Sequence, residues 1–134
     1  MKYLLDSHTC IRFINQRSQA LIDRLTETPD EEIYVCSVVK AEMFYGSERS
    51  TRRERNLTVQ RTFFSRYKSL SFDDMAAETY AVIRADLEGR GQTIGANDLL
   101  IAAIALAHEL TLVTHNVSEF SRVTKLRLED WEAA

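Results

Sequence analysis

Three carboxylates, Asp6, Glu42 and Asp98, lie in or beside segments whose apolar character is typical of a protein core. Asp6 follows the run Tyr3-Leu4-Leu5, and Asp98 precedes the run 99–104. A carboxylate is costly to bury without a partner, and hard divalent cations prefer oxygen ligands. The acids therefore indicate a site for Mg²⁺ or Mn²⁺ rather than Zn²⁺, because no thiolate or imidazole cluster accompanies them. Such sites activate water and stabilise phosphoryl oxygens.

The same acids also have structural interpretations, which their spacing alone leaves open. Ser7 is the expected cap of the first helix, although Asp6 could instead cap a helix over 7–14, and Asp98 could cap a helix over 98–108. Glu42 could be an ordinary surface residue. Asn116 and Glu119 follow another apolar run and could add oxygen ligands to a metal site.

Alternating apolar runs and helical patterns predict the elements that position these acids. The expected strands are 2–5, 33–36, 70–72, 111–114 and, more briefly, 126–128, after which Trp131 is expected to close the core. The expected helices begin after Asp6, near 21, at 37, in a long polar segment over 49–68, after Asp73 and near Asp98. This alternation favours a parallel sheet with helices on both faces, in which sites form at the carboxyl ends of the strands.

A second candidate site is basic. Within 49–68, seven Lys and Arg residues face one acid, Glu54, in a chain whose net charge is −3. Such a local excess can bind RNA phosphates, although a run of charges is more often a solvated helical face. His115 and Asn116 follow a predicted strand and could contact the same substrate. The basic residues assigned to RNA are Arg49, Arg52, Arg53 and Arg55.

Composition sets limits on the class of protein. The length of 134 residues predicts one domain, 1–134, with 45% hydrophobic residues. No apolar stretch is long enough to span a membrane, and an acid at position 6 argues against a signal peptide. Cys10 and Cys36 lie in apolar surroundings, which predicts buried thiols in a reducing cytoplasm.

Four strings, taken together, carry a resemblance to a known family. They are Leu4-Leu5-Asp6, 37–46 (SVVKAEMFYG), 94–102 (IGANDLLIA) and 112–120 (LVTHNVSEF). They resemble the PIN domain and, more narrowly, the VapC toxins of bacterial type II VapBC toxin–antitoxin modules. The resemblance implies an α/β fold, a three-layer α/β/α sandwich around a mainly parallel sheet of four to five short strands.

The same resemblance implies a function. Family members of this kind are Mg²⁺-dependent endoribonucleases, with Mn²⁺ as a substitute, that arrest translation by cutting RNA. The expected substrate is initiator tRNA, cut in its anticodon stem-loop. The expected partners are a VapB-type antitoxin, a second copy of the chain in a homodimer, and a higher toxin–antitoxin assembly in the cytoplasm.

The resemblance also assigns site residues. It maps Asp6, Glu42 and Asp98 onto the family's acidic residues and Glu119 onto the fourth acidic position. Asn116 takes the place where many PIN domains have an Asp. The dipeptide Ser7-His8 also departs from the usual Thr-Asn, so the surroundings of Asp6 differ from the family pattern.

Two alternatives remain at this stage. A phosphatase of the haloacid dehalogenase type also has an Asp after its first strand, but it needs a second Asp two residues later, where His8 stands. A degenerate PIN module would bind RNA or protein without cleaving it. The presence of all three principal acids argues against that second alternative.

Overall fold

The computed structural model describes residues 1–133, whose five strands form one parallel sheet in the order β3-β2-β1-β4-β5. Each strand is three or four residues long, except the two-residue β5. Because all strands run the same way, their carboxyl ends lie along one edge of the sheet. The strands are β1 (Tyr3–Leu5), β2 (Ile33–Cys36), β3 (Lys68–Leu70), β4 (Thr111–Val113) and β5 (Leu128–Glu129).

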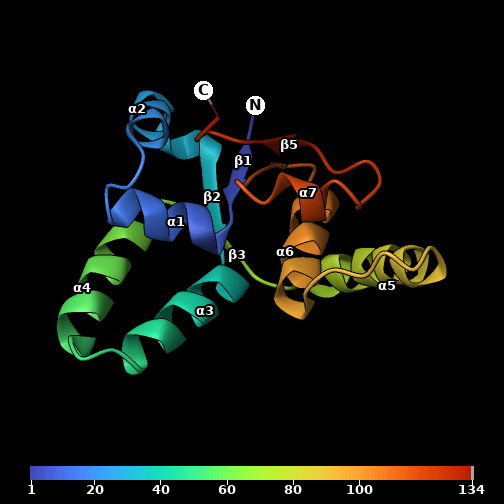
Figure 1. Ribbon diagram of the computed structural model, residues 1–134, viewed down its shortest axis with the longest axis horizontal. Helices are drawn as coiled ribbons and strands as arrows, with labels where there is room; N and C mark the ends of the chain where they lie inside the picture. The colour runs from blue at the N-terminus through green and yellow to red at the C-terminus, as the bar shows by residue number, and fades with distance from the viewer. Residues whose placement is uncertain (134) are drawn as a thin grey trace.

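Helices cover both faces of the sheet, which confirms the predicted three layers (Figure 1). Helices α1 to α4 lie on one side of the strands, and α5 to α7 lie on the other. The helices are α1 (Ser7–Ile14), α2 (Gln19–Glu27), α3 (Ser37–Glu48), α4 (Arg53–Phe64), α5 (Asp74–Gly89), α6 (Ala96–Ala107) and α7 (Val117–Phe120), with a 3₁₀ turn at Asp30–Glu32. No helix among residues 1–133 is both long and apolar enough to cross a membrane.

The hydrophobic core includes the strands and the nearly all-apolar helix α6. Residues Ile101–Ala105 of α6 are buried, as expected for a helix that is apolar on every side. Near the C-terminus, Trp131 is 5% exposed and packs edge-on against Tyr3, with ring centroids 5.0 Å apart. This confirms the expected role of Trp131 in closing the core.

Two predicted strands are displaced along the chain. The strand expected at 70–72 lies earlier in the chain, as β3 over Lys68–Leu70, where Lys68 pairs with Tyr34 of β2. Phe72 lies beyond the strand and packs against Tyr80, with ring centroids 5.8 Å apart. The short strand expected at 126–128 lies later in the chain, as β5 over Leu128–Glu129, which pairs with β4.

The polar segment 49–68 does not form one helix, contrary to the prediction. Helix α3 ends at Glu48, and α4 begins only at Arg53. Ser50 donates from its hydroxyl to the carbonyl of Ser47 and accepts from the side-chain amide of Asn56. Side-chain hydrogen bonds of this kind compete with a continuous helix, so the chain turns between α3 and α4.

The starts of two helices also differ from the prediction, and one helix was not predicted. Helix α6 begins at Ala96 with Gly95 as its N-cap, so Asp98 lies inside the first turn and is not the cap. Ser7 was expected to cap α1, but Asp6 is the N-cap. The short helix α7 follows β4 in a segment where only isolated site residues were expected.

Candidate active site

Asp6 lies at the carboxyl end of the central strand β1 and also caps α1. Its carboxylate accepts a 2.8 Å hydrogen bond from the backbone N–H of Thr9, and its side chain is buried. Burial raises the pKa of Asp6, while hydrogen bonding from Thr114 and Thr9 moderates the rise. The capping interpretation of Asp6 is therefore correct, and it coexists with a place at the sheet edge where sites form.

Glu42 lies on α3 and is tied to the start of α1. The hydroxyl of Ser7 donates a 3.0 Å hydrogen bond to a carboxylate oxygen of Glu42, which is half-buried. The two residues are 35 positions apart, so the contact fixes α3 against the segment that carries Asp6. Glu42 is therefore held in place by a long-range contact, while its role in the site stays a prediction.

Asp98 and Glu119 form a coupled pair across the α6 and α7 segments. Burial, followed by the charge of Glu119 and a hydrogen bond between the two carboxyls, raises the pKa of Asp98 to about 7. Glu119 accepts 2.7 Å and 2.8 Å hydrogen bonds from the Gly95 N–H and the Asn116 amide, which lower its pKa. Below about pH 7 the pair therefore holds a proton, which these opposite shifts in pKa assign to Asp98.

Gly95 lies beside both of these carboxyls. A Cβ atom at Gly95 would lie 3.5 Å from Oδ2 of Asp98 and 3.6 Å from Oε1 of Glu119. Both distances are ordinary van der Waals contacts, so an alanine at this position would not force either carboxyl to move.

The charges of the other three acids all act on Asp98. The charges of Glu42 and Asp6 add to that of Glu119 in raising the pKa of Asp98. The structure thus brings together the four residues that the sequence assigned to catalysis, although they come from four separate segments. A groove of about 640 Å³ lies beside Glu42 and is lined by residues of α3 and α6, among them Tyr45 and Asn97.

The donor set fits a hydrated divalent cation. Among residues 1–133, no three His, Cys, Asp or Glu side chains are placed so that together they could hold a metal ion. Mg²⁺ usually keeps several waters and binds through one or two carboxylates, so it does not require three such side chains. The four acids offer carboxylate oxygens as ligands and, once Asp98 is ionised, excess negative charge. A thiolate or imidazole site for Zn²⁺ has no counterpart in this donor set.

Sequence comparisons agree with this arrangement of fold and acids. Residues 3–126 match the PIN domain family. Ribonuclease VapC2 of Rickettsia felis is 37% identical over 98% of this chain and 99% of its own length. The chain belongs to the VapC ribonucleases of the PIN-domain family. The tRNA(fMet)-specific endonuclease VapC of Salmonella typhimurium is 36% identical over 98% of both chains.

Solved VapC structures share the fold closely. The chain superposes on DNA-bound VapBC from Salmonella typhimurium with a TM-score of 0.92, at 36% identity and 98% coverage of both chains. VapBC2 from Rickettsia felis, bound to a promoter DNA fragment, gives a TM-score of 0.89, covering 98% of this chain and 99% of that one. The family resemblance is confirmed, and the haloacid dehalogenase alternative is wrong.

The four arginines assigned to RNA have different environments in this VapC chain. Arg53 forms ion pairs with Glu48 and Glu54, and Arg52 is exposed. The Arg49 guanidinium lies over the ring of Tyr45, 5.5 Å from its centroid. Arg49 is thus in contact with Tyr45, which lines the groove beside the acids.

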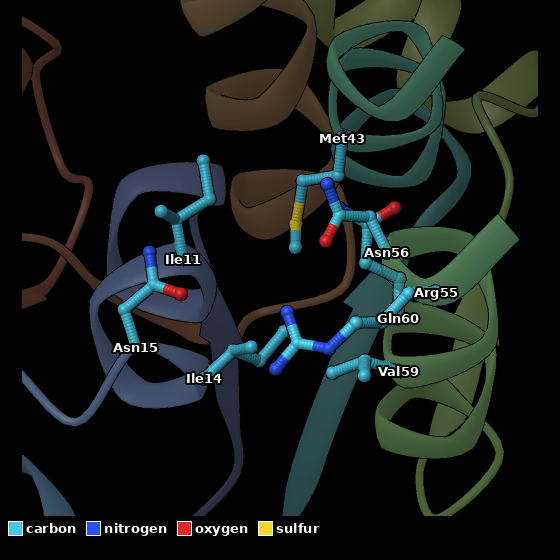
Figure 2. A pocket seen from close by; sticks show the side chains of 8 residues that line it. All are labelled: Ile11, Ile14, Asn15, Met43, Arg55, Asn56, Val59 and Gln60. Atoms are coloured by element: carbon cyan, nitrogen blue, oxygen red, sulfur yellow. The ribbon is translucent and has the colours of Figure 1, made fainter. Parts of the chain in front are cut away.

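Arg55 faces a different cavity. Figure 2 shows its guanidinium between α1 and α4, close to Ile14, in a pocket of about 220 Å³. Ile11 and Met43 supply further apolar walls. The assignment of Arg55 to the same RNA surface as Arg49 therefore has no support in the geometry.

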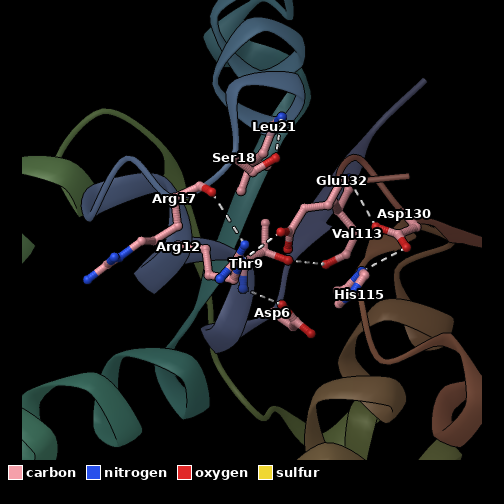
Figure 3. A network of polar contacts seen from close by, with 10 residues as sticks. All are labelled: Asp6, Thr9, Arg12, Arg17, Ser18, Leu21, Val113, His115, Asp130 and Glu132. Atoms are coloured by element: carbon pink, nitrogen blue, oxygen red, sulfur yellow. Dashed lines mark hydrogen bonds and ion pairs between the residues drawn. The ribbon is translucent and has the colours of Figure 1, made fainter. Parts of the chain in front are cut away.

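A polar network extends from Asp6 to the C-terminal segment (Figure 3). The Thr9 hydroxyl donates to the Val113 carbonyl at 3.3 Å, which ties α1 to β4. Arg12 pairs with Glu132 at 2.6 Å, and His115 contacts Asp130 at 2.9 Å. His115 is thus engaged with the C-terminal segment, and it remains exposed at the edge of the site.

Sequence reasoning missed three residues that shape this site. They are Thr9 and Thr114, which hydrogen bond to Asp6, and Gly95, which donates to Glu119. Two of them had a signal in the sequence. Thr9 is a hydroxyl residue three positions after the capping acid Asp6, and Gly95 stands three positions before Asp98.

Proposed function

We propose that this chain is the toxin of a type II toxin–antitoxin module and acts as a Mg²⁺-dependent endoribonuclease. The observation that carries the proposal is the cluster of Asp6, Glu42, Asp98 and Glu119 at the carboxyl edge of the sheet. The ribonuclease and tRNA(fMet)-specific endonuclease relatives, each matched over 98% of this chain, support it. PIN-domain ribonucleases generally depend on a divalent metal ion.

The metal ligands are assigned to Asp6, Glu42 and Asp98. A divalent cation held there would polarise the scissile phosphate and lower the pKa of a bound water. Asp6 is held in place by the Thr9 N–H, and Glu42 is held by Ser7. The residues thus orient their oxygens before substrate binds, which reduces reorganisation during the reaction.

Glu119 has a different role in this proposal. Both of its carboxylate oxygens are engaged, one by the Gly95 N–H and the other by Asn116. It keeps its negative charge and accepts the hydrogen bond of protonated Asp98 in the absence of metal. Metal binding then requires Asp98 to release its proton, so metal affinity should rise with pH.

The proposed partners follow the same comparisons. Several similar structures are VapBC complexes, so we assign a VapB-type antitoxin to this chain and expect a homodimer within a larger complex. An antitoxin arginine would pair bidentately with the carboxylate cluster and displace the cation. The two free, buried cysteines suit a reducing cytoplasm, where we place the protein.

The substrate assignment is tested by incubating the purified protein with initiator tRNA, elongator tRNAs and unstructured RNA. We expect Mg²⁺-dependent cleavage of initiator tRNA within its anticodon stem-loop, and no cleavage in EDTA. Cleavage of every RNA at similar rates would contradict the tRNA assignment but not the ribonuclease. A folded protein that binds RNA but cleaves none of the substrates would favour the degenerate module.

The basic segment provides a separate prediction about RNA binding. Replacing Arg49 with Gln should weaken binding about threefold to tenfold and reduce the salt dependence by about 0.7 per lost phosphate contact. Arg53→Gln is the matched control, because Arg53 is already paired with Glu48 and Glu54. Fluorescence anisotropy across a salt series measures both values, and equal slopes for the two variants would make the segment an ordinary solvated surface.

A further inference from the structure

A polar hollow lies beside the α7 segment, which also carries Glu119. Its volume is about 560 Å³, and it is formed by the loop after α5 and by the α7 segment. Helix α7 and this loop lie on the α5–α7 side of the sheet (Figure 1). The hollow is lined by Gly91, Gln92, Thr93, Ser118, Ser121 and Arg122.

Backbone contacts fix Arg122 in this hollow, and its charge also lowers the pKa of the neighbouring Glu119. Its Nη1 donates to the Thr93 carbonyl at 2.9 Å, and its own carbonyl accepts from Arg90 at 2.6 Å. Arg90 is in turn held by an ion pair with Asp86. Within residues 1–133, Arg122 has no ion pair with a carboxylate. A guanidinium has five N–H donors, so most of those on Arg122 remain available to a ligand.

The neighbouring groups suit an anion with several oxygens. Ser118 and Ser121 add hydroxyl groups to the same wall as Arg122. No acidic side chain lines the hollow. An arginine that presents its donors beside hydroxyl groups matches the geometry of a phosphate, which can accept from both at once.

The hollow is directly connected to the candidate active site. Glu119 is the residue after Ser118, and the Arg122 N–H donates to its carbonyl at 3.1 Å. The loop that supplies Thr93 continues to Gly95, whose N–H donates to the Glu119 carboxylate at 2.7 Å. A strand of RNA bound at the four acids would therefore have a neighbouring phosphate within reach of Arg122.

We propose that the hollow around Arg122 binds a backbone phosphate of the RNA strand that the four acids cleave, next to the scissile phosphate. This inference rests on the proposed ribonuclease function and adds a second contact for its substrate. It differs from the basic segment at 49–55, which lies on the other side of the sheet among α3 and α4. Two separated phosphate contacts would align the strand across the acids.

The test measures binding of a single-stranded RNA oligonucleotide in EDTA, so that cleavage plays no part. Arg122→Gln should raise Kd about threefold to tenfold near 0.1 M salt and reduce the slope of log Kd against log salt by about 0.7. Arg122→Lys should keep most of the slope, because it keeps the charge.

Arg127→Gln is the matched control. Arg127 also donates to a backbone carbonyl, that of Glu109 at 2.7 Å, but it precedes β5 and lies at the opposite edge of the sheet. Its replacement removes the same charge and should leave the slope unchanged. Equal slopes for the Arg122→Gln and Arg127→Gln variants would overturn the inference.

Melting curves of the same variants separate a binding role from a structural one. Arg122 also holds the loop at Thr93, so its replacement could lower the melting temperature. A lower melting temperature with an unchanged salt slope would assign Arg122 to folding alone and refute the phosphate site. If Arg122→Gln reduces the salt slope of binding but the wild-type protein cleaves no RNA, the proposed ribonuclease is refuted while the Arg122 contact stands.

Discussion

Asp6→Asn should reduce RNA cleavage at least about a hundredfold, because even outer-shell partners of a bound metal are worth tenfold to a hundredfold. The substitution removes the negative charge at the carboxyl end of β1 but preserves the shape of the side chain. Asn is also a good N-cap, so the hydrogen bond from the Thr9 N–H should survive and the protein should remain folded. Cleavage of initiator tRNA in Mg²⁺, together with a melting curve, measures both effects.

Asp73→Asn is the matched control for this substitution. Asp73 caps α5 just as Asp6 caps α1, with a 2.8 Å hydrogen bond from a backbone N–H three residues later. It lies away from the four acids, so its replacement should leave the cleavage rate unchanged. Full activity in a folded Asp6→Asn variant would remove Asp6 from the catalytic site.

Asp98→Asn should stabilise the metal-free protein at neutral pH while abolishing activity. The pKa of Asp98 is raised to about 7 in the folded state, against about 3.9 in an unfolded chain. The folded state therefore holds a proton that the unfolded state releases, so stability falls as pH rises from about 4 to about 7. Above about pH 7 the wild type has lost this contribution to its free energy of unfolding, whereas the asparagine variant does not ionise and loses nothing.

The size of this effect is limited by solvent, because Asp98 is only half-buried. We expect a gain of about 1 kcal/mol at pH 8, equivalent to about 3–5 °C in melting temperature, that vanishes near pH 4. Melting curves in EDTA between pH 4 and pH 8 measure it. Asp98→Ala serves as a second variant that lacks the hydrogen bond to Glu119, and a uniform loss of stability in both variants at every pH would contradict the assigned pKa.

The positions of the main acids could be predicted because they depend on local sequence. Asp6 and Asp98 adjoin apolar runs that had to become a strand and a buried helix. Parallel strands then place their carboxyl ends at one edge, whatever the details of the loops. Glu42 was the hardest of the three, since its inward position is fixed by Ser7, 35 residues away.

The hydrogen bonds that hold these acids in place could not be predicted, because they join segments that are far apart in the sequence. Thr9 bonds to the carbonyl of Val113, 104 positions along the chain, and Glu119 reaches back 24 positions to Gly95. Such contacts follow from the packing of distant segments, which spacing along the sequence does not encode. The helix α7 was missed because four residues are too few for a periodic pattern.

For the basic segment, the sequence predicts the charge but not the role of each arginine. Its charge was plain in the sequence, but the roles of individual arginines depended on a turn that the prediction lacked. The break between α3 and α4 places Arg55 in a pocket with α1, and Arg53 beside Glu48. Arg122, in contrast, stands alone in sequence and gains its interest only from the hollow around it.

The most direct test of the central claim is a Mn²⁺-binding titration of the wild-type protein and the Asp6→Asn and Asp98→Asn variants, followed by electron paramagnetic resonance. Free Mn²⁺ gives a signal that is lost on binding, so the readout does not depend on cleavage. We expect the wild type to bind Mn²⁺ over the same concentration range in which Mn²⁺ supports RNA cleavage, and both variants to bind at least about tenfold more weakly. Equal binding by all three proteins, or RNA cleavage by the wild type in EDTA, would contradict a metal site built from these acids.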